Sequence, residues 1–116
     1  MALSAEKRLK HARDFRAVSR SKLSVKEGSL LLKAQASQKN VSRFGIVVSK
    51  RVAKKAVDRN RIRRLLSEAL RVKQGSLKGP YDVVLVALPG FSLKNLSEAQ
   101  SIITKLFSKV KLSVVS

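Results

Sequence analysis

The segment Ser49–Arg71 restricts the possible folds of this chain more than any other, because it is strongly basic and yet periodic. Its apolar residues recur at the i, i+3, i+4 and i+7 spacing of one buried helix face, namely Ile62, Leu65, Leu66 and Ala69. A disordered basic tail would carry no such stripe. The segment therefore predicts a helix that packs one of its sides against a folded core.

A second face of the same helix carries the charge. At about 100° per residue, Asn60, Arg64, Ser67 and Arg71 align away from the apolar stripe, with Arg63 beside them. The loop before the helix adds four more cations, which are Lys50, Arg51, Lys54 and Lys55. A row of guanidinium groups on a helix that is fixed by its other side predicts a docking surface for phosphates.

The net charge indicates the class of partner. The chain has 26 Lys and Arg against seven Asp and Glu, a net charge of +19, which opposes compaction unless a polyanion neutralises it. A membrane surface is the alternative, but it favours a basic amphipathic helix with Trp or Phe on its apolar side. The chain has no Trp, and the basic helix has no aromatic residue. We therefore expect a nucleic acid partner and no membrane partner.

Composition excludes several other classes. At 116 residues, 44% of them hydrophobic, the chain predicts one domain over residues 1–116, disordered up to about Lys7. The absence of cysteine excludes disulfides, thiolate zinc sites and cysteine nucleophiles. The sequence has neither a membrane-spanning apolar run nor a signal-peptide core. We expect a cytoplasmic protein with no obligate protein partner.

Around the basic helix the sequence predicts an α+β sandwich, with helices on one face of a sheet and part of the other face open. Tyr81–Leu88 is a continuous apolar run, typical of a strand buried on both faces. Arg43–Ser49 is predicted to pair with Ser29–Ala36 as an antiparallel hairpin, and Gly45 indicates a bulge or the close approach of another backbone. The other predicted elements are a short strand at Leu23–Lys26 and helices at His11–Arg20, Ala56–Lys73 and Ser97–Lys111, the last capped by Ser97.

No catalytic group is evident in the sequence. The seven acids are scattered over the predicted elements, without the clustered carboxylates of a metal-dependent nuclease. His11 is the only imidazole, and the glycines do not have phosphate-loop spacing. From its residues alone, the chain is predicted to bind nucleic acid without cutting it.

The stretch from Phe44 to Arg71 resembles the signature of the bacterial ribonuclease P protein component family. The pattern is G-x-x-V-S-K-[KR] followed by A-V-x-R-N-R-x-[KR]-R-x-x-R-[EQ]. It is met by Gly45, Val48, Ser49, Lys50, Arg51, Ala56, Val57, Arg59, Asn60, Arg61, Arg63, Arg64 and Glu68. The earlier RLKHARDFRAV and the later YDVVLVALP are similar to the family's first helix and last strand, so the resemblance covers nearly the whole chain.

This resemblance implies an α-β sandwich with roughly four strands, three helices and a left-handed βαβ crossover. It also implies the protein subunit of a ribonucleoprotein that removes the 5′ leader of precursor tRNA, in which a catalytic RNA performs the metal-dependent hydrolysis. Mg²⁺ would be held mainly by that RNA, with no catalytic residue and no tightly bound cofactor in this chain. Metal sites of the protein itself are left unassigned.

The resemblance also assigns residues by position. The leader would lie in a cleft between the first helix, the sheet and the basic helix, where the ring of Phe15 would stack on a base. Ser19, Leu32 and Ser67 occupy further leader-binding positions. The residues expected to bind the catalytic RNA are Lys50, Arg51, Lys54, Lys55, Arg59, Asn60, Arg61, Arg63, Arg64 and Arg71.

Five positions depart from the family pattern, and they weaken the expected leader contacts more than the family resemblance. An aromatic residue is replaced by Ser19, a tyrosine by Leu32 and an arginine by Ser67. A loop glycine is replaced by Ala53, and an arginine after the last strand by Leu88.

Two other functions stay open on the sequence alone. A ribosomal or other structural RNA-binding protein of similar fold would share the basic helix, whereas a self-sufficient nuclease would cleave precursor tRNA without an RNA subunit. Phe15 also has a second interpretation, because a phenylalanine beside Val18 on a short amphipathic helix is often part of the core.

Overall fold

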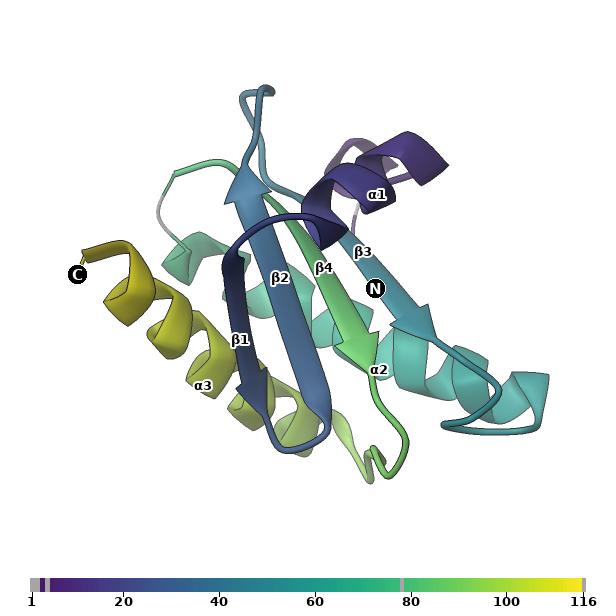
Figure 1. Ribbon diagram of the computed structural model, residues 1–116. Helices are drawn as coiled ribbons and strands as arrows, with labels where there is room; N and C mark the ends of the chain where they lie inside the picture. The colour runs from purple at the N-terminus through teal and green to yellow at the C-terminus, as the bar shows by residue number, and fades with distance from the viewer. Residues whose placement is uncertain (1–2, 4, 78, 116) are drawn as a thin grey trace.

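The described part of the chain forms three α-helices and a four-stranded mixed sheet (Figure 1). The structure is a computed structural model and describes residues 3, 5–77 and 79–115, with side chains as far as Lys111. The elements in chain order are η1 (Ala5–Lys7), α1 (Ala12–Ser19), β1 (Leu23–Glu27), β2 (Leu30–Ala36), β3 (Arg43–Val48), α2 (Ala56–Lys73), η2 (Gln74–Ser76), β4 (Tyr81–Ala87) and α3 (Leu96–Val115). Within these residues, no helix is both long enough and apolar enough to cross a bilayer.

The strand order β1-β2-β4-β3 corrects the predicted hairpin. β2 and β3 are not neighbours, because β4 lies between them, antiparallel to β2 and parallel to β3. The prediction rested on the short connection between the two strands. It was overruled because β4, an apolar strand buried on both faces, takes an interior position in the sheet.

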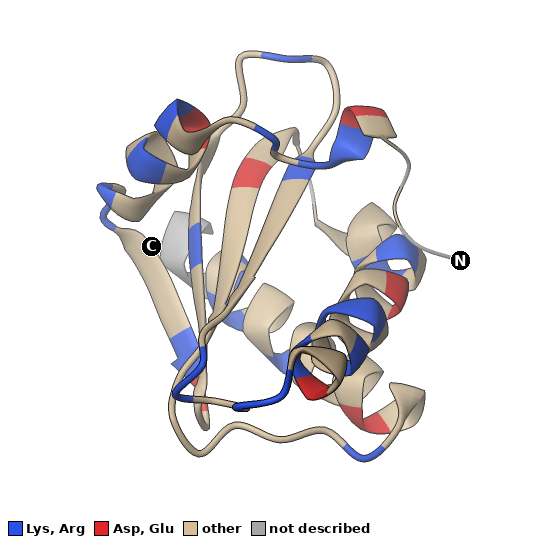
Figure 2. Cartoon of the chain, turned by 90° about the vertical axis from the view of Figure 1, so that its right-hand side faces the viewer, with Lys and Arg blue, Asp and Glu red and all other residues tan. Residues whose placement is uncertain are grey.

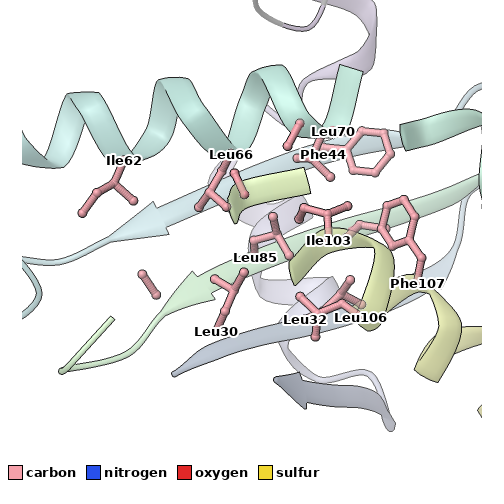
Figure 3. Packing of buried hydrophobic residues seen from close by; sticks show 14 of the residues in the cluster. Leu30, Leu32, Phe44, Ile62, Leu66, Leu70, Leu85, Ile103, Leu106 and Phe107 are labelled. Atoms are coloured by element: carbon pink, nitrogen blue, oxygen red, sulfur yellow. The ribbon is translucent and has the colours of Figure 1, made fainter. Parts of the chain in front are cut away.

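The two faces of the sheet are covered by different helices. α2 and α3 pack on one face, where the main core includes Leu32, Phe44, Leu66, Leu85 and Phe107 (Figure 3). α1 lies on the opposite face, which the sequence pattern did not predict, and a small cluster of Leu9, Val18 and Val84 holds it there. α1 leaves part of this face open, as expected, because Val47 at the edge stays 38% exposed.

The β3–α2–β4 unit has the left-handed crossover that the family resemblance implied. In Figure 1 both strands point downward, β3 lies to the right of β4, and α2 passes behind the sheet. Nearly all parallel crossovers have the opposite hand. The crossover places the basic helix along the edge strand β3, across the sheet from α1.

The predicted disorder up to about Lys7 falls in part on residues 1, 2 and 4, which lie outside the described residues. Of the others, residues 5–7 form η1, and Leu3 is only 5% exposed within the main core. The Leu9 amide donates to the Phe44 carbonyl, and Arg8 forms an isolated parallel bridge with the same residue. This segment therefore lies along the outer edge of β3, whose unpaired backbone groups it helps to satisfy.

The last helix begins one residue before the predicted cap. Asn95 caps α3, because its side-chain oxygen accepts a hydrogen bond of 2.9 Å from the Glu98 amide, whereas Ser97 lies inside the first turn. α3 extends to Val115, four residues beyond the predicted end at Lys111.

A partly buried ion pair joins the two neighbouring strands β3 and β4. Arg43 and Asp82 face each other in register, and the guanidinium donates two hydrogen bonds of 2.9 and 2.7 Å to the carboxylate. Asp14 of α1 approaches the same guanidinium at 3.6 Å. The Asp82 hydrogen bond raises the pKa of Arg43 above its ordinary value. The pair thus links α1 to the sheet.

Breaking this pair should destabilise the fold. Asp82→Asn keeps the side-chain shape but leaves Arg43 without its main counter-charge, so we expect a loss of roughly 3 kcal/mol in the free energy of unfolding, measured with urea. The control is Glu68→Gln, which breaks the solvent-screened pair with Arg71 and should cost much less. Equal losses in the two variants would show that the Asp82 pair acts as a surface pair.

Candidate nucleic-acid interface

α2 has the two faces that its sequence predicted. Ile62, Leu66, Ala69 and Leu70 are buried against the core, with Leu65 half-buried beside them. On the other side Asn60, Arg64 and Arg71 are exposed, and Ser67 is partly exposed. Figure 2 shows the resulting cluster of basic residues along this helix. The burial of one side fixes the direction in which the cations point.

The loop before α2 presents a second group of cations. Lys50, Arg51, Lys54 and Lys55 are all exposed, and none of their side chains has a hydrogen-bond or ion-pair partner among the described residues. Ala53 stands where the family has a glycine, which put the loop geometry in question. Every described residue with positive φ is a glycine, so Ala53 adopts an ordinary backbone conformation and causes no strain.

Two arginines of the motif each donate two hydrogen bonds to the protein's own backbone. Arg59 donates to the carbonyls of Ala53 and Lys54, at 3.0 and 2.8 Å. Arg61 donates to the carbonyls of Leu93 and Lys94, at 2.7 and 2.6 Å. Both side chains are half-buried. Part of each guanidinium is therefore engaged within the fold, which the sequence motif did not reveal.

The remaining arginines of α2 differ in how many contacts their guanidinium groups make within the protein. Arg63 donates to the Asn60 side chain at 2.9 Å and to the Val48 carbonyl at 3.3 Å. Arg71 forms an ion pair of 2.7 Å with Glu68, and this contact helps to lower the pKa of Glu68 to about 2. Arg64 is exposed and has no such partner among the described residues. Of the arginines on α2, Arg64 is the most available to a phosphate.

A cavity of about 340 Å³ lies between α1, β3 and α2. Its lining includes Phe15 together with Arg63, Arg64 and Ser67 of α2, and Leu9 of the N-terminal segment. The Phe15 ring lies over Gly45, where a Cβ would come within 2.4 Å of it. The predicted close approach at Gly45 is therefore made by a side chain and not by another backbone, and the β3–β4 register continues without a bulge.

The predicted leader-binding residues do not all reach this cavity. Ser67 lines it, and its hydroxyl accepts a hydrogen bond of 3.3 Å from the Leu3 amide. Ser19 is exposed but lies outside the cavity lining, with its hydroxyl bonded to the Arg16 carbonyl. Phe15 is half-buried, so it both packs against the sheet and faces the cavity.

Leu32 was assigned wrongly. It is fully buried in the main core, on the sheet face that α2 and α3 cover, and cannot contact RNA in the folded chain. Side chains alternate along a strand, so an error of one residue moves a position to the other face. The residues of β2 on the α1 side include its neighbours Leu31 and Lys33.

The acids do not form a metal centre. Among the described residues, no group of three or more His, Asp or Glu side chains lies close enough together to hold a metal ion. Several carboxylates are instead paired with cations, such as Asp82 with Arg43 and Glu27 with Lys109. These contacts serve the fold.

Comparison with known proteins agrees with this architecture. A family model described as Ribonuclease P matches residues 3–111. The ribonuclease P protein component of Clostridium kluyveri is 36% identical over 107 residues, covering 90% of this chain and 95% of that one. That of Alkaliphilus metalliredigens is 30% identical over 110 residues, covering 95% and 98%.

Solved structures have the same fold. The Staphylococcus aureus RNase P protein superposes with a TM-score of 0.79 at 24% identity, covering 90% of this chain and 95% of that one. The Thermotoga maritima protein gives a TM-score of 0.75 at 23% identity, covering 88% and 96%. The chain therefore belongs to the family of bacterial ribonuclease P protein components, the protein subunits of a tRNA-processing ribonucleoprotein.

Proposed function

We propose that this chain binds the catalytic RNA of ribonuclease P and the 5′ leader of precursor tRNA, and that the RNA carries out the hydrolysis. The observation that carries this proposal is the cavity whose lining includes both Phe15 of α1 and Arg63 and Arg64 of α2. The aromatic ring can stack on a base, and the guanidinium groups can bind phosphates. The two kinds of contact that a single strand needs thus meet at one site.

The catalytic RNA is assigned to α2 and the loop before it. Arg64 and the four cations of the loop are exposed and without partners among the described residues, so little has to be broken before they bind phosphate. The buried side of α2 holds the row in place, which lowers the entropy lost on binding. Binding at this surface should be strongly dependent on salt.

The leader is assigned to the cavity and the open part of the sheet beside it. Leu31, Val86 and Val47 stand opposite one another in register across β2, β4 and β3, on the face that carries α1. Lys33 lies on the same face two residues from Leu31, and its ammonium group donates to the Ser19 carbonyl. This arrangement supports contact of bases with the apolar strip and of phosphates with the lysine beside it.

Catalysis is assigned to the RNA, as the family resemblance implies, and several carboxylates of this chain are engaged in ion pairs. Asp82 is held by Arg43, and Glu68 by Arg71, which leaves neither of them placed as a general base. We propose that Mg²⁺ is held mainly by the RNA and its phosphates. The chain would act in the cytoplasm, where bacterial precursor tRNA is made. The alternative of a ribosomal protein has no support from the family match.

Reconstitution tests this function directly. Precursor tRNA is incubated at low magnesium with the chain, with a bacterial ribonuclease P RNA, or with both, and the released leader is measured. We expect cleavage with both components, and none with the chain alone. Cleavage by the chain alone would identify a self-sufficient nuclease. If the chain neither activates the RNA nor favours precursor over mature tRNA, a purely structural RNA-binding role would replace this proposal.

Phe15→Ala tests the leader site. Loss of stacking on one base should weaken the preference for precursor over mature tRNA by about 1–3 kcal/mol, measured by equilibrium binding. The control is Phe15→Leu, which fills much of the space over Gly45 without an aromatic face. The two variants should lose similar leader affinity, although Phe15→Leu remains more stable to urea. A variant that unfolds more easily yet keeps its leader preference would show that Phe15 is a core residue only.

A further inference from the structure

Two loops are fastened to opposite flanks of α2 by arginines. On one flank Arg59 holds the loop that carries Lys54, and on the other Arg61 holds the loop between β4 and α3. Each guanidinium donates to the carbonyls of two consecutive residues. Because a guanidinium is rigid and planar, two such bonds fix a loop in orientation as well as in distance.

The β4–α3 loop is well placed to be fixed in this way. Phe91 and Leu93 are buried in the main core, and Asn95 caps α3, so both sides of Lys94 are anchored. The Lys94 carbonyl accepts the 2.6 Å hydrogen bond from Arg61, while its side chain is exposed. The Lys94 ammonium group has no hydrogen-bond or ion-pair partner among the described residues. It is therefore a free cation beside the basic helix.

We propose that Lys94 is a phosphate contact for the catalytic RNA and that Arg61 is the positioning residue that holds it there. This inference rests on the proposed function and extends its RNA surface to a third segment, after the loop 50–55 and the exposed row of α2. It also changes the role of Arg61, which the family motif alone would make a direct RNA ligand.

The chemistry favours Lys94 over Arg61 as the direct contact. Arg61 is half-buried and already has two of its N–H groups on carbonyls, so full engagement with a phosphate would release the loop. The Lys94 ammonium is exposed and bears a full charge that no described acid neutralises. Each cation that binds a phosphate displaces counterions, which gives a measurable signature in the salt dependence.

The experiment measures the affinity of the full chain for a bacterial ribonuclease P RNA over a range of KCl concentrations. Lys94→Ala should make the slope of log affinity against log salt shallower by about one unit. A fourfold increase in salt should then weaken binding about 3–4-fold less than it does for the wild-type chain. Arg61→Ala should make the slope shallower by a similar amount, because Lys94 loses its position. The double variant should also lose only about one unit. Lys105→Ala, an exposed lysine of α3, is the control and should leave the slope unchanged.

The double variant decides between the two roles of Arg61. A loss of about two units would show that Arg61 contacts phosphate itself, and an unchanged slope in Arg61→Ala would show that it does not position the loop. An unchanged slope in Lys94→Ala would overturn the contact, whether or not Arg61→Ala folds. Lys94→Arg should keep the slope of the wild-type chain. Absence of RNA binding by the wild-type chain would instead overturn the proposed function.

Discussion

The burial of β4 on both faces is the constraint on which the rest of this structure depends. Val83 and Leu85 point into the core beneath α2 and α3, whereas Val84 points to the other side and contacts the cluster that holds α1. A strand of this kind needs cover on both faces and neighbours on both edges. Its interior position separates β2 from β3, draws α1 onto the second face and places Phe15 over Gly45. The candidate leader cavity follows from these contacts.

The net charge of +19 sets a second condition, because the core must hold together a chain that repels itself. The cations can therefore bind a polyanion only where the fold holds them apart from one another and exposed to solvent. α2 meets this condition with one buried side, and several cations beside it bind backbone carbonyls or carboxylates. A polyanion that docks on the remaining free cations would relieve the repulsion, which couples RNA binding to the stability of the fold.

The sequence predicted those features that depend on local periodicity. The two faces of α2 and the buried strand β4 were correct to within one residue, because apolar spacing and turn residues specify them directly. The predicted pairing of β3 with β2 was wrong, and the burial of Leu3 was not predicted, since both depend on contacts between distant segments that no local pattern encodes. Leu32 shows most clearly where prediction from sequence fails, because a shift of one residue along a strand exchanges a core position for a surface one.

A sequence motif also cannot distinguish an arginine that binds a phosphate from one that binds a carbonyl. Both roles use the same planar set of donors, so both preserve the same residue type. In this chain Arg59 and Arg61 bind loop carbonyls, whereas the side chain of Arg64, one turn farther along α2, is exposed and has no such contact among the described residues. On the proposed function, some arginines would bind RNA directly, and others would fix the loops on which lysines such as Lys94 bind it.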